Sequence, residues 1–147
     1  MREVLIAFVL VSALVLASCA EPFGANLRRY EEMHLSLART LSVTMKIEYT
    51  VDFLNYWQSP RETLDRGKGD CEDIALLAAY LLGPEASLVE LDCGTMVTHM
   101  VVKYGEACYD PQAGVIIDLS AREVLREYTY QEAMAKSTLW GTKGGVL

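Results

Sequence analysis

Cysteine and histidine are scarce in this chain of 147 residues, which holds four cysteines and only two histidines. Structural zinc sites usually contain close cysteine pairs. No C-x-x-C pair occurs, so a zinc site built from Cys71, Cys93, Cys108 and His99 has little support. Apart from Cys19, the chain has three cysteines, which is an odd number. In an oxidising compartment at least one of these three thiols therefore stays free or pairs with a cysteine outside this set. For Cys93 and Cys108 two alternatives stay open, a mutual disulfide or burial as small apolar residues.

Basic residues are outnumbered, since 13 lysines and arginines stand against 20 aspartates and glutamates, giving a net charge of −7. Binding to nucleic acid depends largely on Lys and Arg side chains that meet phosphates. No basic run occurs, so we expect no nucleic-acid partner. Internal repeats and low-complexity stretches are also absent from the sequence. The length indicates one domain at most.

The longest apolar run lies at the N-terminus, from Val4 to Leu16. It is shorter than the roughly 20 residues that a membrane span needs, and it is typical of a secretory signal. Residues 16–19, Leu-Ala-Ser-Cys, resemble the bacterial lipobox, in which the cysteine is lipidated after cleavage. Ordinary signal cleavage, with Cys19 incidental, is the alternative. We expect a signal peptide at 1–18, a lipidated tether at 19–26, a domain at 27–140 and a loose tail at 141–147.

The lipobox resemblance also predicts a location. Ala20 rather than Asp follows the cysteine, which implies retention at the periplasmic face of the outer membrane. In a cell without an outer membrane, the anchored domain would lie on the outer surface. Lipidated Cys19 would then hold the domain at a membrane.

Hydrophobic periodicity predicts a single α+β domain, with helices first and an antiparallel sheet after them. Apolar positions with helical spacing cover 27–41, whereas residues 43–53 alternate as in a strand, with a weaker helical alternative. Ser120 and Glu123 match a capping box, which predicts a helix over 120–136. Further strands are expected in the apolar segments 87–92, 96–104, 107–110 and 113–119, and a helical turn is expected after Pro60.

The helix expected at 71–82 begins in an unusual setting. Asp70 is an N-cap residue type and Asp73 stands three residues later, as in a capping box, while Gly83 follows the last turn. Cys71 therefore lies in the first turn, where the helix dipole stabilises a thiolate. The neighbouring acids, including Glu72, oppose this effect because negative charge raises a thiol pKa. The acids need another role, such as capping or binding a cation.

A nucleophilic cysteine also needs a base, and His34 and His99 are the two candidates. His34 lies on or beside a helical stripe, which favours packing over catalysis. His99 lies in a segment that reads as a hairpin ending near Asp110. A turn at Tyr104-Gly105 places His99 opposite Asp110, and a turn at Gly105-Glu106 places them diagonally on one face. A three-residue loop would separate them.

The segments "YWQSPRETLDRGKGDCEDIALLAAYLL", "THMVV" and "CYDP" resemble the transglutaminase-like superfamily, and among its members the bacterial transglutaminase-like cysteine proteases. The resemblance covers about residues 43–118. It implies a papain-like core, in which a helix that carries the nucleophile packs on an antiparallel sheet. By motif, Cys71 would be the nucleophile, His99 the base and Asp110 the residue that orients the base.

The resemblance has further implications for ligands. Some members of this protease group bind calcium through the acids that flank the cysteine, which here are Asp70 and Glu72. Two adjacent acids fall well short of the six to eight oxygens that calcium takes, and no cofactor is expected to be required. Trp57 and Gln58 match the "YWQ" positions, where packing is favoured over a role in stabilising an oxyanion.

We therefore expect a lipid-anchored envelope enzyme that acts on peptide or side-chain amides through a Cys-His-Asp triad and a thioester. Hydrolysis is expected over crosslinking on resemblance alone, with a protein or peptide as substrate. The chain is short, which leaves little room for insertions that build a substrate cleft. The alternative is a lipoprotein that keeps the fold as a binding or scaffold module without turnover.

Overall fold

The computed structural model describes residues 23–51, 56–94 and 96–141. They belong to two units, Met1–Leu35 and Ser36–Leu147. Helix α2 (Phe23–Thr44) contains the boundary between the units, and every other described element belongs to the second unit. The expected signal peptide, lipobox and Cys19 lie outside the described residues. Among the described helices, none combines the length and apolar character that a membrane span requires.

The second unit is built on an antiparallel sheet of five strands in the order β6-β5-β4-β3-β7. Strands β3 and β4 pair over seven residues each, and β5 continues from β4 as a hairpin. The edge strands β6 and β7 pair with β5 and β3. The strand bounds are β3 Ala86–Asp92, β4 Thr98–Tyr104, β5 Ala107–Asp110, β6 Val115–Ile117 and β7 Glu123–Tyr128.

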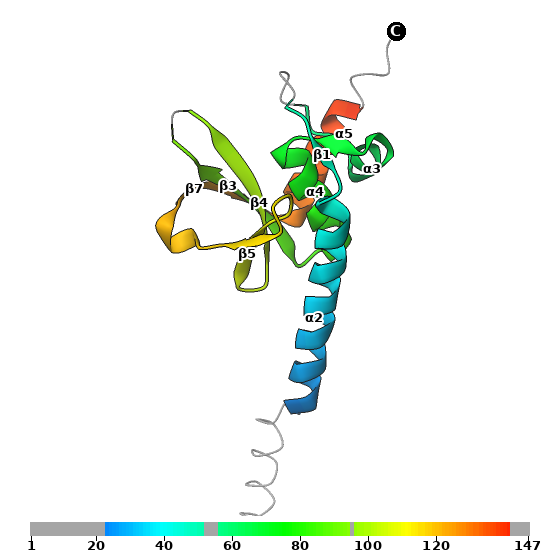
Figure 1. Cartoon of the computed structure of the whole chain (residues 1–147), viewed down its shortest axis with the longest axis vertical. Coiled ribbons are helices and arrows are strands. Elements are labelled where there is room, and N and C mark those ends of the chain that lie inside the picture. The colour runs from blue at the N-terminus through cyan, green and yellow to red at the C-terminus, as the bar shows by residue number, and fades with distance from the viewer. Residues whose placement is uncertain (1–22, 52–55, 95, 142–147) are drawn as a thin grey trace, which may run out of the picture. The chain divides into compact units, whose positions relative to one another are not determined.

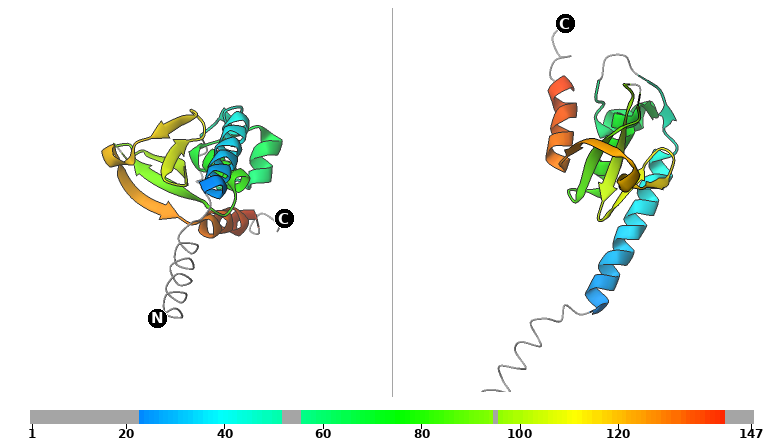
Figure 2. Two further views of the ribbon diagram at one scale, coloured as in Figure 1. Left: turned by 90° about the horizontal axis from the view of Figure 1, so that it is seen from below. Right: turned by 90° about the vertical axis from the view of Figure 1, so that its left-hand side faces the viewer.

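Helix α4 (Cys71–Leu82) packs against strands β3 and β4 (Figure 1). Its residues 73–79 are all buried, so this helix supplies much of the core. Helix α3 (Pro60–Arg66) packs on α4, and α5 (Tyr130–Gly141), orange to red in Figure 2, contacts α4, β3 and β7. A second apolar cluster, formed by Val89, Leu91, Val101 and Cys108, packs with Ile117 and Leu119.

Local chemistry explains where the two helices before the sheet begin. Ser59 accepts a hydrogen bond from the Glu62 N–H, and Pro60 occupies the first turn of α3. Asp70 and Asp73 form a reciprocal capping box at the start of α4. Both the predicted helix over 71–82 and the turn after Pro60 are therefore confirmed.

Two predictions from local pattern are wrong. Within residues 43–51, the described part of the strand expected over 43–53, only β1 (Glu48–Tyr49) forms; it pairs in parallel with β2 (Lys68–Gly69), and α2 continues to Thr44. The helix expected over 120–136 is instead a 3₁₀ turn (Leu119–Ala121), strand β7 and helix α5. Thr129 and Glu132, not Ser120 and Glu123, form the cap from which α5 begins. Pairing with β3 decided the conformation of this segment.

Candidate active site

Cys71 is the first residue of α4, and its side chain is half-buried beside strand β4. The backbone N–H of Met100 donates a hydrogen bond to the sulfur. The thiol itself donates to Glu72 Oε2 at 3.1 Å. Within the described residues, no hydrogen bond joins Cys71 and His99. The sulfur therefore lies at the backbone of β4, one residue along the strand from His99.

The thiol is held in its protonated form in this arrangement. Burial, the charge of Glu72 and the hydrogen bond to Glu72 raise the pKa of Cys71 to about 12, and Asp70 adds to this. The Met100 N–H lowers the pKa of the Cys71 thiol. Burial first, and the acids second, thus outweigh the stabilisation that a helix start gives a thiolate.

Asp70 experiences the same crowding of negative charge. Burial, followed by the charges of Glu72 and Asp73, raises the pKa of Asp70 to about 8. A hydrogen bond shared with Glu72 contributes to the shift. At neutral pH a protonated Asp70 can therefore donate a hydrogen bond to Glu72, so that Glu72 accepts hydrogen bonds from residues on both sides.

His99 and Asp110 lie together across the β4–β5 hairpin, where His99 Nε2 is 2.8 Å from Asp110 Oδ2. A carboxylate only accepts hydrogen bonds, so Nε2 carries the proton and Nδ1 is left with a lone pair in the neutral ring. The side-chain exposures of 27% and 14% place this pair in a partly protected position. The imidazole thus has one nitrogen fixed and the other able to accept a proton.

Asp110 is itself anchored. Its Oδ1 accepts hydrogen bonds from the backbone N–H groups of Gln112 and Ala113, each at 2.9 Å. Burial alone would raise the pKa of the Asp110 carboxyl, but the hydrogen bond from His99 and these two N–H donors outweigh it, so the pKa is lowered. The carboxylate is therefore kept ionised and oriented towards the ring.

The hairpin has the register of the second predicted alternative. Lys103 pairs with Cys108 and Tyr104 with Ala107, so Gly105 and Glu106 form the two-residue turn. Gly105 has φ of +62°, and a positive φ at the first central position suits a type II′ turn. This register, with His99 diagonal to Asp110, brings the two side chains together.

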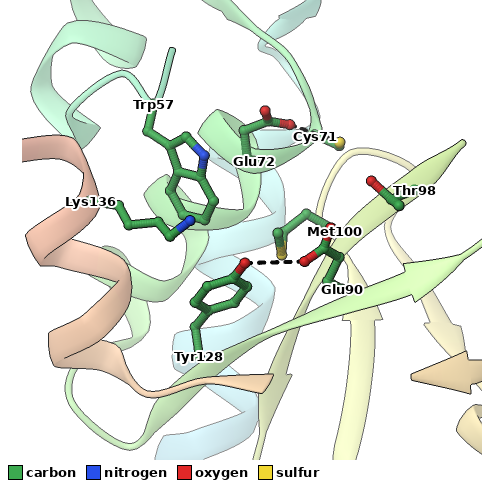
Figure 3. Close-up of a pocket in the computed structure, with 8 residues that line it drawn as sticks. All are labelled: Trp57, Cys71, Glu72, Glu90, Thr98, Met100, Tyr128 and Lys136. Carbon is green, nitrogen blue, oxygen red and sulfur yellow. Dashed lines mark hydrogen bonds between the residues drawn. The ribbon is translucent and has the colours of Figure 1, made fainter. Parts of the chain in front are cut away.

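A small cavity of about 70 Å³ adjoins Cys71 (Figure 3). Glu72 lies between the sulfur and the indole of Trp57, and the Tyr128 hydroxyl donates to Glu90 Oε2 at 3.1 Å. Lys136 Nζ lies 4.6 Å from the ring centre of Trp57 and 4.9 Å from that of Tyr128, which are cation–π distances. The eight lining residues are Trp57, Cys71, Glu72, Glu90, Thr98, Met100, Tyr128 and Lys136.

Part of this cavity is not apparent from the sequence. Trp57 was singled out by motif, and its 3% exposure agrees with the favoured packing role. Tyr128 and Lys136 were not identified, because both fell within a helix that does not form as expected. Residues 123–128, Glu-Val-Leu-Arg-Glu-Tyr, do not alternate between polar and apolar side chains, so the sequence offered no strand signal there.

The other predicted ligands are not brought into a metal site. Within the described part of the chain, no three or more His, Cys, Asp and Glu side chains form a group that could hold a metal. Cys71, Cys93 and Cys108 are all free thiols. Cys108 is buried as a small apolar residue, whereas Cys93 is exposed, so neither alternative for this pair holds in full. The side chain of His34 is outside the described residues.

The sequence matches no protein-family profile and no curated protein. Its fold is similar to that of LapG from Legionella pneumophila, a transglutaminase-like cysteine protease, with a TM-score of 0.55 and 21% identity. That match covers 66% of this chain and 65% of LapG. The calcium-bound and EGTA-treated forms of LapG give the same TM-score and identity, over 65% and 63% of their chains. The chain therefore has a papain-like, transglutaminase-like fold.

Proposed function

We propose that the protein is a cysteine peptidase or amidohydrolase that acts on peptide or side-chain amides through Cys71, His99 and Asp110. The observation that carries the proposal is the 2.8 Å contact between His99 Nε2 and Asp110 Oδ2, which leaves Nδ1 as a base on β4, the strand whose Met100 backbone interacts with the Cys71 sulfur. The fold shared with LapG supports it. Hydrolysis is proposed over crosslinking because LapG is a protease.

In the proposed reaction, His99 Nδ1 takes the Cys71 proton and the thiolate attacks the amide carbonyl. The C–N bond breaks as the imidazolium protonates the leaving amine, which leaves a thioester on Cys71. Water then attacks the thioester with His99 as base, giving a carboxylic acid and the free thiol. Asp110 keeps Nε2 protonated throughout and stabilises the imidazolium.

The thiol must leave Glu72 before this reaction can begin. In the resting arrangement the S–H bond points to Glu72 Oε2 rather than to an imidazole nitrogen. A rotation of the side chain about its Cα–Cβ bond would direct the sulfur elsewhere. We propose that this rotation precedes each turnover, and that Glu72 determines how often the reactive arrangement is populated.

The proposed setting is the cell envelope. A lipid on Cys19 would hold the domain at a membrane face, where a protein or peptide substrate would reach it. The net charge of −7 gives no support to a nucleic-acid partner.

Calcium fits the site only in part. The repulsion among Asp70, Glu72 and Asp73 suits a cation, since it raises the pKa of Asp70. Two carboxylates fall short of the oxygens that calcium takes, and the described residues form no larger cluster of ligands. Asp70 and Glu72 are the residues that would hold the ion, and no step of the proposed reaction depends on it.

The test compares the pH dependence of Cys71 alkylation by iodoacetamide in the parent, Glu72→Gln, His99→Ala and the double variant. Mass spectrometry of the Cys71 peptide separates this cysteine from the others. We expect Glu72→Gln to bring the midpoint below the ordinary thiol value of about 8.5. In the double variant that decrease should be lost, because the imidazolium no longer stabilises the thiolate.

An equal midpoint in Glu72→Gln with and without His99 would contradict the proposal. Cys71 would then be an ordinary thiol, and the domain would be a binding or scaffold module with this fold. His34→Ala is the matched control, because it removes the other histidine of the chain and should leave the midpoint unchanged.

A further inference from the structure

Asp73 is a buried carboxylate that the proposed reaction does not use. It lies in the first turn of α4 with 0% exposure. One oxygen, Oδ2, accepts from the backbone N–H of Asp70 at 3.3 Å, which completes the capping box. This bond fixes the residue immediately before the cysteine.

The other oxygen reaches a distant segment. Asp73 Oδ1 accepts a hydrogen bond of 2.7 Å from the backbone N–H of Gln58, which lies 15 residues earlier in the chain. Gln58 directly follows Trp57, whose ring forms a wall of the cavity beside Cys71. A single side chain therefore bonds the segment of the cavity wall and the turn that presents the sulfur.

The space around Gly69 shows how closely the turn before Cys71 packs against the Asp73 side chain. A Cβ atom added at Gly69 would lie 2.7 Å from Asp73 Cβ and 2.9 Å from Asp73 Oδ2. Real Cβ atoms essentially never approach so closely, so either the turn or Asp73 would have to shift. The chain before the cysteine thus packs directly against the side chain that bonds both segments.

We propose that Asp73 is a positioning residue that holds the wall of the substrate cavity, through Gln58 and Trp57, in a fixed relation to the nucleophile Cys71. The effect is one of geometry, because it acts through the hydrogen bonds of Asp73 to the backbone of Gln58 and of Asp70. A substrate held against Trp57 is thereby placed relative to the sulfur. This inference rests on the proposed role of Cys71.

The test uses the full chain with Trp140→Phe, so that Trp57 is the only tryptophan. Two quantities are measured well below the Tm of each variant. They are the rate of Cys71 alkylation by iodoacetamide at one fixed pH, read by peptide mass spectrometry, and the emission maximum of Trp57. Neither measurement needs a substrate or turnover.

We expect Asp73→Ala to change both quantities. The sulfur loses its fixed, partly buried position, so the alkylation rate should rise by about tenfold or more as iodoacetamide gains access to it. The Trp57 emission should move to longer wavelength as the ring becomes hydrated. Gly69→Ala should shift both in the same direction although the carboxylate is retained. Asp73→Asn, with one acceptor oxygen, should lie between Asp73→Ala and the parent.

Val89→Ala is the matched control for loss of stability. Val89 is 1% exposed and packs in the cluster with Leu91, Val101 and Cys108. The Val89→Ala variant should have a lower Tm than the parent, but the same alkylation of Cys71 and the same Trp57 emission maximum. The proposal is overturned if Asp73→Ala and Gly69→Ala behave like this control, or if one quantity moves without the other. Failure of the His99 test with a positive result here would remove the proposed function and leave the link through Asp73 standing.

Discussion

Glu72 illustrates how one carboxylate can set the chemistry of its neighbours. It accepts a hydrogen bond of 3.1 Å from the Cys71 thiol and shares a hydrogen bond with Asp70. Both effects favour the protonated form of the neighbouring group. At this helix start, Asp70 and the Cys71 thiol thus keep their protons at pH values where an isolated carboxyl or thiol would lose them.

The raised pKa of Asp70 predicts a pH-dependent stability. A carboxyl that binds its proton more tightly when folded adds stability below its unfolded pKa near 3.8, and this is lost as the pH rises towards about 8. Asp70→Asn keeps a capping side chain without the charge. We expect the variant to match the parent at pH 4 and to be more stable by at least about 1 kcal/mol at pH 8.

Thermal unfolding at a series of pH values measures this difference. Asp118→Asn serves as the control, because Asp118 is an exposed cap whose pKa is lowered by hydrogen bonds from Ser120. That variant should show no gain at pH 8. Parallel stability curves for the parent and Asp70→Asn would show that Asp70 is ionised throughout.

The same acids allow a direct test of the proposed calcium site. If Asp70 and Glu72 hold a calcium ion, its charge should lower the pKa of Cys71 and its binding should raise the Tm. Thermal scans and alkylation profiles with calcium, with magnesium and with EGTA would measure both effects. The calcium response should disappear in Asp70→Asn. Equal curves in all three solutions would rule out the site.

At the scale of elements, the β4–β5 hairpin decides whether His99 meets Asp110. The side-chain period of a strand is two, so a shift by one residue moves a side chain to the other face. A glycine inserted between Gly105 and Glu106 should therefore separate the imidazole from the carboxylate. We expect loss of the His99 dependence of Cys71 alkylation, and a change in the His99 ring signals in NMR spectra.

A glycine inserted between Pro84 and Glu85 is the control for this experiment. Both residues are exposed and belong to the turn between α4 and β3. The control should retain the His99 dependence. A hairpin insertion that also retains it would show that Asp110 is dispensable for orienting the ring.

Sequence predicted those elements whose signals are local and agree with one another. Helix α4 has a capping box, an apolar face and a terminating glycine, and its bounds are as expected. Ser120 and Glu123 gave an equally local signal, but pairing of Glu123–Tyr128 with β3 outweighed it. Sequence did not decide between the two hairpin registers. A turn at Tyr104-Gly105 and a turn at Gly105-Glu106 both leave His99 and Asp110 on one face.

Sequence likewise predicted only part of the candidate site. Motifs brought forward Cys71, His99 and Asp110, and the structure brings the last two together. The bond between Asp73 and Gln58 joins segments 15 residues apart, and no periodicity reports such a contact. The position of Lys136 over two aromatic rings likewise depends on tertiary packing.

At the scale of the whole molecule, the proposed lipid anchor makes a prediction about location. Cys19→Ser removes the lipid attachment site, so the protein should move from the membrane fraction to the soluble fraction after cell disruption. Immunoblots of the separated fractions would measure this. Cys93→Ser is the control and should remain with the membrane. Recovery of both variants in the same fraction would contradict lipid anchoring.

The hydrogen bond from Cys71 to Glu72 has a consequence for the lifetime of the protein. Burial and Glu72 raise the pKa of Cys71, so at pH 7 a far smaller fraction of it is thiolate than the few per cent of an ordinary cysteine. Peroxides attack the thiolate, and the first product is a sulfenic acid. The resting protein is thus protected against oxidative inactivation, and its vulnerability to peroxide would be confined to the moments in which Glu72 releases the sulfur.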